Sequence, residues 1–210
     1  SVLNRPAIEV NWRRETQANP ALYNGPVFLS PAVRISGGVL EGAYARADFA
    51  TLMYWRSDSS HQRPWHVFGV GVVVSSDNRL IAARMAARTA LPGRVYFPAG
   101  SVDESDVIGG MVDYDASMAR EVREETGLDL GCGRREEVLH MVTARRSVAL
   151  FRRFRFPLLA EQLVAHVRNH IGAQRQPELD DAVVISGVGE MNDNTPSYVR
   201  TFADWHFRQG

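Results

Sequence analysis

Three glutamates crowd one short stretch of the chain, which reads AREVREETGL. The pattern predicts a helix, on which Glu121 stands about one turn from both Glu124 and Glu125. Like charges at these spacings cost an isolated helix roughly 0.2–0.5 kcal/mol per pair. Arg120 and Arg123 relieve the repulsion only in part, whereas hard divalent cations such as Mg²⁺ take carboxylate oxygens as ligands. The cluster therefore indicates a metal site on a helix rather than a merely solvated face.

The rest of the chain alternates between strand-like and helical patterns. Apolar, β-branched or alternating segments predict strands at residues 66–76, 79–87, 94–100, 136–144, 148–158 and 181–188. Helical patterns begin near Asp115 and recur at residues 159–171 and 197–207; Asp113 or Asp115 suits the N-cap of the first helix, and Gly127 its C-terminus. The first 60 residues read as irregular, apart from strand-like residues 27–36 and a strand or hairpin that runs into a short helix.

Together these patterns predict an α/β fold, an α+β sandwich in which a mixed β-sheet is packed between helices. No repeat or linker divides the chain, so we expect a single domain, 1–210, with an N-terminal extension (1–60) and a core (61–210). The isolated GVG at residues 69–71 lacks the rest of a dinucleotide fingerprint and favours close packing of a strand.

Composition narrows the function classes. The formal net charge is zero, which gives no reason to expect nucleic acid or an anionic membrane as a partner. All 24 basic residues are arginine, so a lysine nucleophile is excluded, and Cys132 is the only cysteine, so an internal disulfide is impossible. No apolar run reaches the ~18 residues of a membrane span. The first residues lack a secretory signal pattern, and we expect a cytoplasmic protein.

The stretch REVREETGL resembles the second half of the Nudix box, R-E-U-x-E-E-x-G-U with U aliphatic, at every specified position. Upstream, VYFPAGSVDE resembles the strand and glycine loop that precede that box. The chain is therefore identified by resemblance with the Nudix hydrolase superfamily, which implies the Nudix fold. It departs from the pattern before the helix: if Gly100 is the loop glycine, about six extra residues lengthen the loop. The first glutamate of the box is then lost, or replaced by Asp113 or Asp115.

The resemblance implies an enzyme that hydrolyses a nucleoside diphosphate linked to another group, X, with Mg²⁺ or Mn²⁺ as cofactor. It assigns the metal to Glu121, Glu124 and Glu125, with the carbonyl of Ala99 as a further ligand. Glu121 and Glu124 then act in catalysis. By the same resemblance, Arg120 pairs with Glu124, one turn on, and fixes its rotamer.

The general base stays open between a box glutamate and an acid on a distant loop. Glu178 and Asp180 lie in such a loop and Glu104 lies near the metal loop, although solvation explains each of these acids as well. Arg145 and Arg146 are candidates for binding phosphates, because a guanidinium group can donate two parallel hydrogen bonds to a phosphate. A position on an exposed strand face would explain these two arginines equally well. His66, His166 and His170 show no metal-ligand spacing, so we expect them to pack or to face water.

Two resemblances outside the box compete for the substrate. NPALYNGPVF and VGVVVSSDNRLIAAR resemble the UDP-glucose pyrophosphatase branch of the Nudix proteins, which implies a nucleotide sugar cleaved to a nucleoside monophosphate and a sugar phosphate. The interrupted box instead resembles the coenzyme A diphosphatases, and an ADP-ribose-like substrate is a further alternative. A Nudix module that only binds its ligand generally loses one of the glutamates, and here all three remain. We expect a small-molecule partner, with a homodimer and a pocket-shaping role for the extension as open possibilities.

Overall fold

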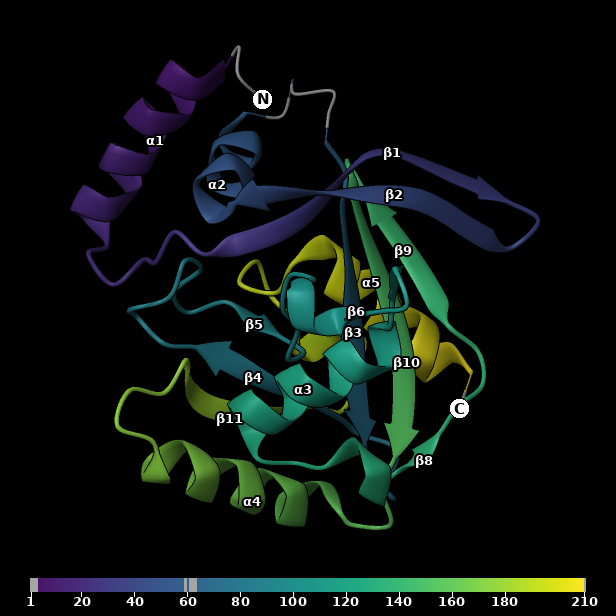
Figure 1. Cartoon of the computed structure of the whole chain (residues 1–210). Coiled ribbons are helices and arrows are strands. Elements are labelled where there is room, and N and C mark those ends of the chain that lie inside the picture. The colour runs from purple at the N-terminus through teal and green to yellow at the C-terminus, as the bar shows by residue number, and fades with distance from the viewer. Residues whose placement is uncertain (1–3, 59, 61–63, 210) are drawn as a thin grey trace.

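The computed structural model describes residues 4–58, 60 and 64–209. Its centre is a mixed sheet in the order β11-β4-β3-β10-β8, with β5 beside β4 and β9 beside β10 (Figure 1). Strands β3 and β10 pair in parallel, and the remaining neighbours pair antiparallel. The strands are β3 (His66–Val74), β4 (Leu80–Met85), β5 (Val95–Tyr96), β8 (Arg134–Arg135), β9 (His140–Ala144), β10 (Ser147–Arg155) and β11 (Leu179–Ile185).

Helices cover both faces of this sheet. The helices α3 (Tyr114–Thr126) and α4 (Ala160–Ala173) pack on one face, and α5 (Ser197–Arg208) packs on the other (Figure 1). The two faces carry separate hydrophobic clusters, with Met118, Val122 and Leu163 on the first and Phe151 and Phe202 on the second. The predicted mixed sheet packed between helices is confirmed.

Strand β3 explains how helix α3 comes so close to the sheet. Every residue of β3 is buried, as expected for a strand covered on both faces. A Cβ atom on Gly69 would stand 3.0 Å from the side chain of Met118, and one on Gly71 would stand 3.0 Å from Val122. The two glycines therefore leave the room that α3 occupies, and the packing interpretation of GVG is confirmed.

The N-terminal part of the chain is more regular than its sequence predicts. It forms α1 (Arg5–Ala18), a hairpin of β1 (Pro26–Ser36) and β2 (Val39–Asp48), and α2 (Phe49–Ser57). The hairpin and the short helix were expected, but the irregular structure expected for residues 5–18 is wrong. Helix α1 buries only Asn11, so its sequence carries no apolar stripe from which a helix could be read.

The N-terminal elements meet the core through the hairpin. Ser30 and Trp65 exchange backbone hydrogen bonds of 2.8 and 2.7 Å, which joins β1 to the segment entering β3. The division at residues 60 and 61 remains a prediction, and residue 61 lies outside the described ranges. Nowhere in those ranges is there a helix with the length and apolarity of a membrane span.

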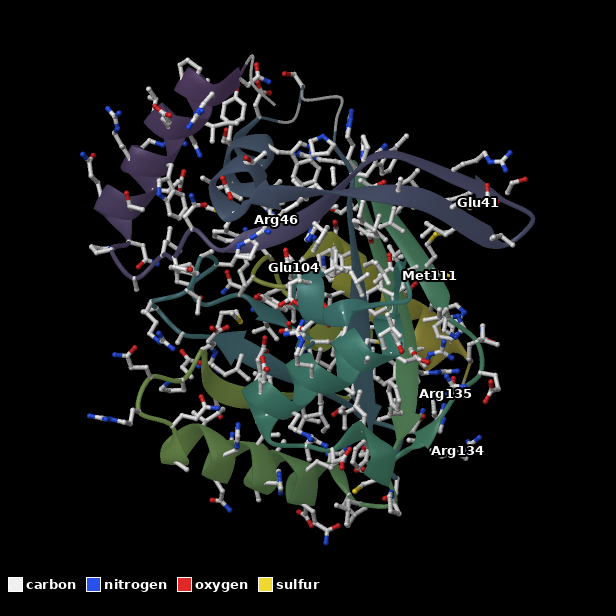
Figure 2. The ribbon with its side chains drawn as sticks, in the orientation of Figure 1. Glu41, Arg46, Glu104, Met111, Arg134 and Arg135 are labelled. Carbon is white, nitrogen blue, oxygen red and sulfur yellow. The ribbon has the colours of Figure 1, made fainter. Side chains whose placement is uncertain are left out.

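The extra residues before the box helix form a small structure of their own. They comprise the 3₁₀ turn η2 (Glu104–Asp106) and a short hairpin of β6 (Val107–Ile108) and β7 (Met111–Val112). Gly109 and Gly110 take φ values of 59° and 80° at its turn, where glycine is favoured. Met111 lies exposed on this hairpin (Figure 2). Further 3₁₀ turns are η3 (Leu130–Cys132) and η4 (Val188–Glu190).

Candidate metal and catalytic site

Helix α3 begins and ends as its sequence predicts. The Asp113 side chain accepts a hydrogen bond from the backbone N–H of Ala116 at 3.0 Å, which caps the N-terminus. Gly127 ends the helix in the left-handed region, with φ 72°, and its N–H donates to the Arg123 carbonyl. Because Met118 and Val122 anchor the buried face, the register of the acidic residues is fixed.

The Gly100 loop and Glu121 are in direct contact. A Cβ atom at Gly100 would collide with the Glu121 carboxylate, so only glycine lets this side chain lie against the loop backbone. The Glu121 side chain is 13% exposed, whereas that of Glu124 is 63% exposed. The loop at Gly100 and the Glu121 carboxylate are therefore neighbours, although the two residues are 21 positions apart in the sequence.

Arg120 reaches the predicted partner, Glu124, at 3.6 Å, but its shorter contacts lie elsewhere. Its Nη1 donates to Glu121 Oε1 at 2.6 Å, and its Nη2 donates to Asp106 Oδ2 at 2.9 Å. Asp106 is 1% exposed and belongs to the inserted segment. The insertion thus supplies a buried carboxylate that anchors Arg120, and Arg120 in turn holds Glu121 more closely than Glu124.

The buried glutamates are electrostatically strained. Burial raises the pKa of Glu121 to about 7, against the lowering effect of Arg120. Burial also raises the pKa of Glu125 well above its ordinary value, and the neighbouring charges of Glu121, Glu178 and Glu124 add to the effect. Glu125 Oε2 is buried and has no hydrogen-bond partner among the described residues. A buried carboxylate oxygen without a partner is unfavourable unless the carboxylate takes up a proton or binds a cation.

Of the three acids considered as a base, only Glu178 lies beside the box glutamates. It immediately precedes β11, and its charge acts on Glu125. Arg88 holds the segment before it by donating to the carbonyl oxygens of Pro177, at 2.9 Å, and Gln176. The other two acids pair with surface arginines: Asp180 with Arg84 at 3.9 Å, and Glu104 with Arg46 at 2.7 Å (Figure 2).

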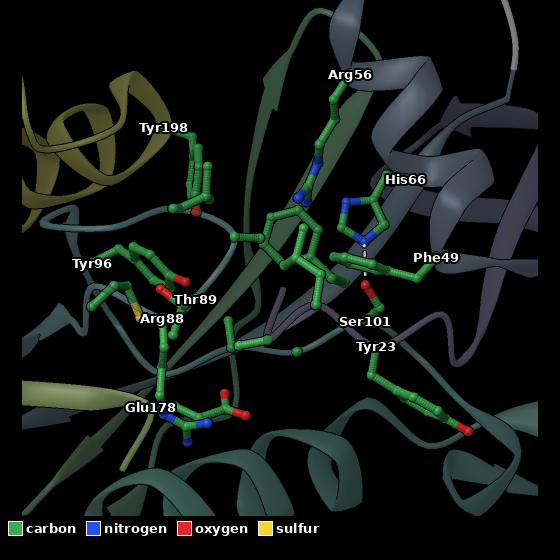
Figure 3. A pocket seen from close by; sticks show the side chains of 18 residues that line it. Tyr23, Phe49, Arg56, His66, Arg88, Thr89, Tyr96, Ser101, Glu178 and Tyr198 are labelled. Atoms are coloured by element: carbon green, nitrogen blue, oxygen red, sulfur yellow. Dashed lines mark hydrogen bonds between the residues drawn. The ribbon is translucent and has the colours of Figure 1, made fainter. Parts of the chain in front are cut away.

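A cavity of about 350 Å³ opens next to this group. Ala99, Gly100 and Glu178 form part of its wall, and Arg56 projects into it from helix α2. Figure 3 shows Arg56 and Glu178 on opposite sides, with Tyr96 and Tyr198 along one wall and Tyr23 and Phe49 along another. The first 58 residues also contribute Ala21 and Leu22 to the lining. The cavity therefore combines an acidic side, aromatic walls and a guanidinium group.

Arg145 and Arg146 lie in a second, smaller cavity of about 150 Å³. They occupy the turn between β9 and β10 rather than a strand face, and Arg145 takes a φ of 55° there. Trp55 and Arg56 also line this second cavity, so Arg56 borders both.

His66, His166 and His170 make packing contacts rather than gathering at one site. His66 is 3% exposed, and its Nε2 lies 3.1 Å from the hydroxyl of Ser101 at the wall of the larger cavity. His166 and His170, on α4, hydrogen-bond to the carbonyl oxygens of Gly127 and Glu124 near the end of α3. Two histidines therefore fix α4 against the helix that carries the glutamates.

The chemistry of the side chains fits a hard divalent cation. In the described part of the chain no three Asp, Glu, His or Cys side chains are gathered closely enough to form a ready metal cluster. Glu121 is held by Arg120, and the Glu124 side chain is exposed. The unpartnered Oε2 of Glu125 and the raised pKa of Glu121 nevertheless mark carboxylates that a cation would stabilise.

Neither a family model nor a curated protein matches the sequence. Among solved structures, the MutT protein from Methanosarcina mazei Go1 is similar, at 16% identity and a TM-score of 0.47, over 71% of this chain and 98% of that one. The NUDIX domain of Shewanella oneidensis NrtR, complexed with ADP ribose, gives 12% identity and a TM-score of 0.48 over 74% and 95%. A NUDIX hydrolase from Nitrosomonas europaea gives 14% and 0.45 over 85% and 86%. At these values the function must be argued from the residues of the site.

Proposed function

We propose that this protein is a Nudix hydrolase that cleaves a nucleoside diphosphate linked to X into a nucleoside monophosphate and X-phosphate, with a nucleotide sugar such as UDP-glucose as substrate. The observation that carries the proposal is the buried, unpartnered carboxylate oxygen of Glu125, which lies among other acids beside a cavity. A solvated helix face would leave each carboxylate in water, and a purely structural acid would have a partner.

Glu121, Glu124 and Glu125, with the Ala99 carbonyl, would hold Mg²⁺ or Mn²⁺. When bound, such ions neutralise the diphosphate and make a water nucleophile available near neutral pH. Arg120 orients Glu121 through its bond to the buried Asp106, and Gly100 leaves the space in which that carboxylate lies. Each of these residues therefore has a defined part in placing the carboxylates for the metal.

Glu178 is the general base in this proposal. It lies on the cavity wall, faces the box glutamates, and is carried by a segment that Arg88 holds in place. From this position its carboxylate accepts the proton of the water that attacks phosphorus. The proton leaves the water as the new P–O bond forms and the bridging oxygen departs with the other phosphate.

The preference for a nucleotide sugar rests on the NPALYNG stretch. Ala21, Leu22 and Tyr23 of this stretch line the cavity. The amide of Asn19 donates to the carbonyl oxygens of Arg88 and Thr89 at 2.8 and 3.0 Å. The segment that resembles the UDP-glucose pyrophosphatase branch thus borders the space in which X would bind. Arg145 and Arg146 would contact a substrate that extends past Arg56 into the second cavity.

Product analysis tests the reaction. The protein is incubated with Mg²⁺ or Mn²⁺ and, separately, UDP-glucose, GDP-mannose, ADP-ribose, NADH and coenzyme A, and the products are separated by chromatography. We expect UDP-glucose to give UMP and glucose 1-phosphate, and EDTA to abolish the conversion. Preferential cleavage of coenzyme A or ADP-ribose would keep the reaction and overturn the substrate.

A variant pair tests the metal role. Glu125→Gln should remain folded and lose at least the ~10²–10³ of turnover that a single transition-state stabiliser contributes. Glu9→Gln, on the exposed helix α1, is the matched control and should retain full turnover. Near-normal turnover of folded Glu125→Gln would refute the role of Glu125. Absence of turnover for every compound by the wild type would favour a module that binds its ligand without cleaving it.

A further inference from the structure

The larger cavity contains two guanidinium groups in different states. Arg88 is engaged, because it donates to the carbonyl oxygens of Pro177 and Gln176. Arg56 also lines the cavity, but among the residues that the structure describes it has no hydrogen bond and no ion pair. The two arginines therefore differ in what they leave available to a ligand.

The surroundings of Arg56 leave its guanidinium group open to a ligand. The residue is exposed, and it borders both cavities. Neighbouring protein atoms lower the pKa of Arg56 through partial desolvation. Arginine stays protonated even so, and Arg56 therefore presents to the cavities a positive charge that no described acid pairs with. A ligand that brings an anion would pair with this charge.

Charge complementarity identifies the ligand group. Glu178 is the acid in the lining of the cavity, its charge acts on the box glutamate Glu125, and Arg56 lies across the cavity from Glu178 (Figure 3). A guanidinium matches a phosphate with two parallel N–H···O bonds. We infer that Arg56 binds a phosphate oxygen of the substrate diphosphate and thereby fixes it between helix α2 and the box glutamates. This inference rests on the proposed function, since it names the residue that receives the diphosphate of that substrate.

The N-terminal elements are built to hold Arg56 in place. Two backbone N–H groups at the start of α2 are satisfied by the loop before β1: Phe49 donates to the Gly25 carbonyl at 2.9 Å, and Ala50 donates to the Asn24 side chain at 2.8 Å. Leu52 anchors the helix with no exposed surface. Residues before the core thus complete the binding site, beyond any role in shaping it.

Calorimetric titration with the non-hydrolysable α,β-methylene analogues of UDP and ADP, with Mg²⁺ and again with EDTA, tests the inference. We expect Arg56→Met to weaken binding of the better analogue at least tenfold. The affinity of Arg56→Lys should fall between those of Arg56→Met and the wild type, since lysine keeps the positive charge but cannot donate two parallel hydrogen bonds. Arg5→Met is the matched control, because Arg5 is exposed on α1, and it should bind as the wild type does. In turnover, Arg56→Met should raise KM more than it lowers kcat.

A stability measurement separates binding from folding. Because Arg56 has no partner in the described chain, free Arg56→Met should melt at the same temperature as the wild type or higher, and should gain less from the analogue. A clearly lower melting temperature without ligand would assign Arg56 a structural role and overturn the inference. If Arg56→Met does not fold, wild-type affinity in Arg56→Lys would overturn the inference in its place.

The two proposals fail separately. If the wild type cleaves a nucleoside diphosphate derivative but Arg56→Met binds the analogues equally well, the inference falls and the enzyme stands. If the wild type binds the analogues through Arg56 but cleaves nothing, the hydrolase falls and the binding residue stands. If neither analogue binds the wild type in Mg²⁺ or EDTA, the inference is overturned.

Discussion

Replacing Glu121 by glutamine should stabilise the metal-free protein at alkaline pH while destroying its activity. Burial raises the pKa of the Glu121 carboxyl from 4.5 to about 7, so the folded chain retains this proton at pH values where the unfolded chain has released it. As pH rises from 4.5 to 7, wild-type stability therefore falls, and above pH 7 the loss is complete. At 1.36 kcal/mol per pH unit, the gap corresponds to about 3 kcal/mol.

Glutamine has nearly the same shape and no charge, so Glu121→Gln lacks this loss. The difference in the free energy of unfolding between variant and wild type should therefore be about 3 kcal/mol larger at pH 8 than at pH 4. Comparing two pH values removes contributions of glutamine that do not depend on pH, such as its packing against Gly100.

Urea unfolding in EDTA, followed by fluorescence at pH 4 and pH 8, measures this difference. Glu9→Gln is the control, because Glu9 is exposed on α1, and its profile should follow that of the wild type. Turnover of Glu121→Gln with Mg²⁺ should fall in the same experiment. A pH-independent stability difference would refute the account of a strained, buried carboxylate, and normal turnover would refute its part in the site.

Three further perturbations probe two supports of the site and one buried histidine on helix α5. Gly100→Ala should lower turnover by tenfold or more although Glu121 itself is unchanged, since the added methyl group collides with the Glu121 carboxylate. Steady-state kinetics would measure the loss, and an unchanged kcat/KM would contradict the close packing of Glu121 on Gly100. Arg88→Met should lower kcat by roughly tenfold, because the segment carrying Glu178 loses two hydrogen bonds, and Arg88→Lys should recover part of it. Burial lowers the pKa of His206 to about 4, so the unfolded chain takes up this proton first and stability falls between pH 6.5 and 4. His206→Gln should flatten this part of the urea-unfolding profile by up to about 3 kcal/mol, and a wild-type slope in the variant would exclude His206 as its source.

The features of the site that could be predicted from the sequence are those whose residues lie close together along the chain. The spacing of Glu121, Glu124 and Glu125 is local, and so are the Asp113 cap and the Gly127 stop of helix α3. Each follows from helix geometry alone. The buried strand β3 was equally predictable, because its apolar run is unbroken. Helix α1 was not, because it buries almost nothing and so leaves no periodic apolar signal.

The contacts that complete the site join distant segments, and no local pattern encodes them. Asp106 meets Arg120 only because the inserted hairpin folds back toward α3. Glu178 was one of several acids in loops, and only the sheet order, with β11 beside β4, brings it to the cavity. Arg56 was one of 24 arginines and had no motif around it. The signal that singles it out is its place in the lining of the larger cavity together with the absence of a side-chain hydrogen bond or ion pair within the described residues, and both require coordinates.

Because the glutamates and the opposite side of the cavity lie on different elements, substitutions on the two sides should have different effects. The glutamates sit on one helix whose register the core fixes, so a substitution there alters the chemistry directly. The opposite side of the cavity is carried by α2 and by residues 21–23, which precede β1. Substitutions on that side can alter which diphosphate is held without disturbing helix α3 or the sheet beneath it. We therefore expect substrate preference to respond to residues 21–56 and reaction type to residues 99–125.

Exchanging Tyr23 or Phe49 for alanine should then change the ratio of kcat/KM between two substrates while the products remain a nucleoside monophosphate and X-phosphate. A change in the bond cleaved would contradict this separation.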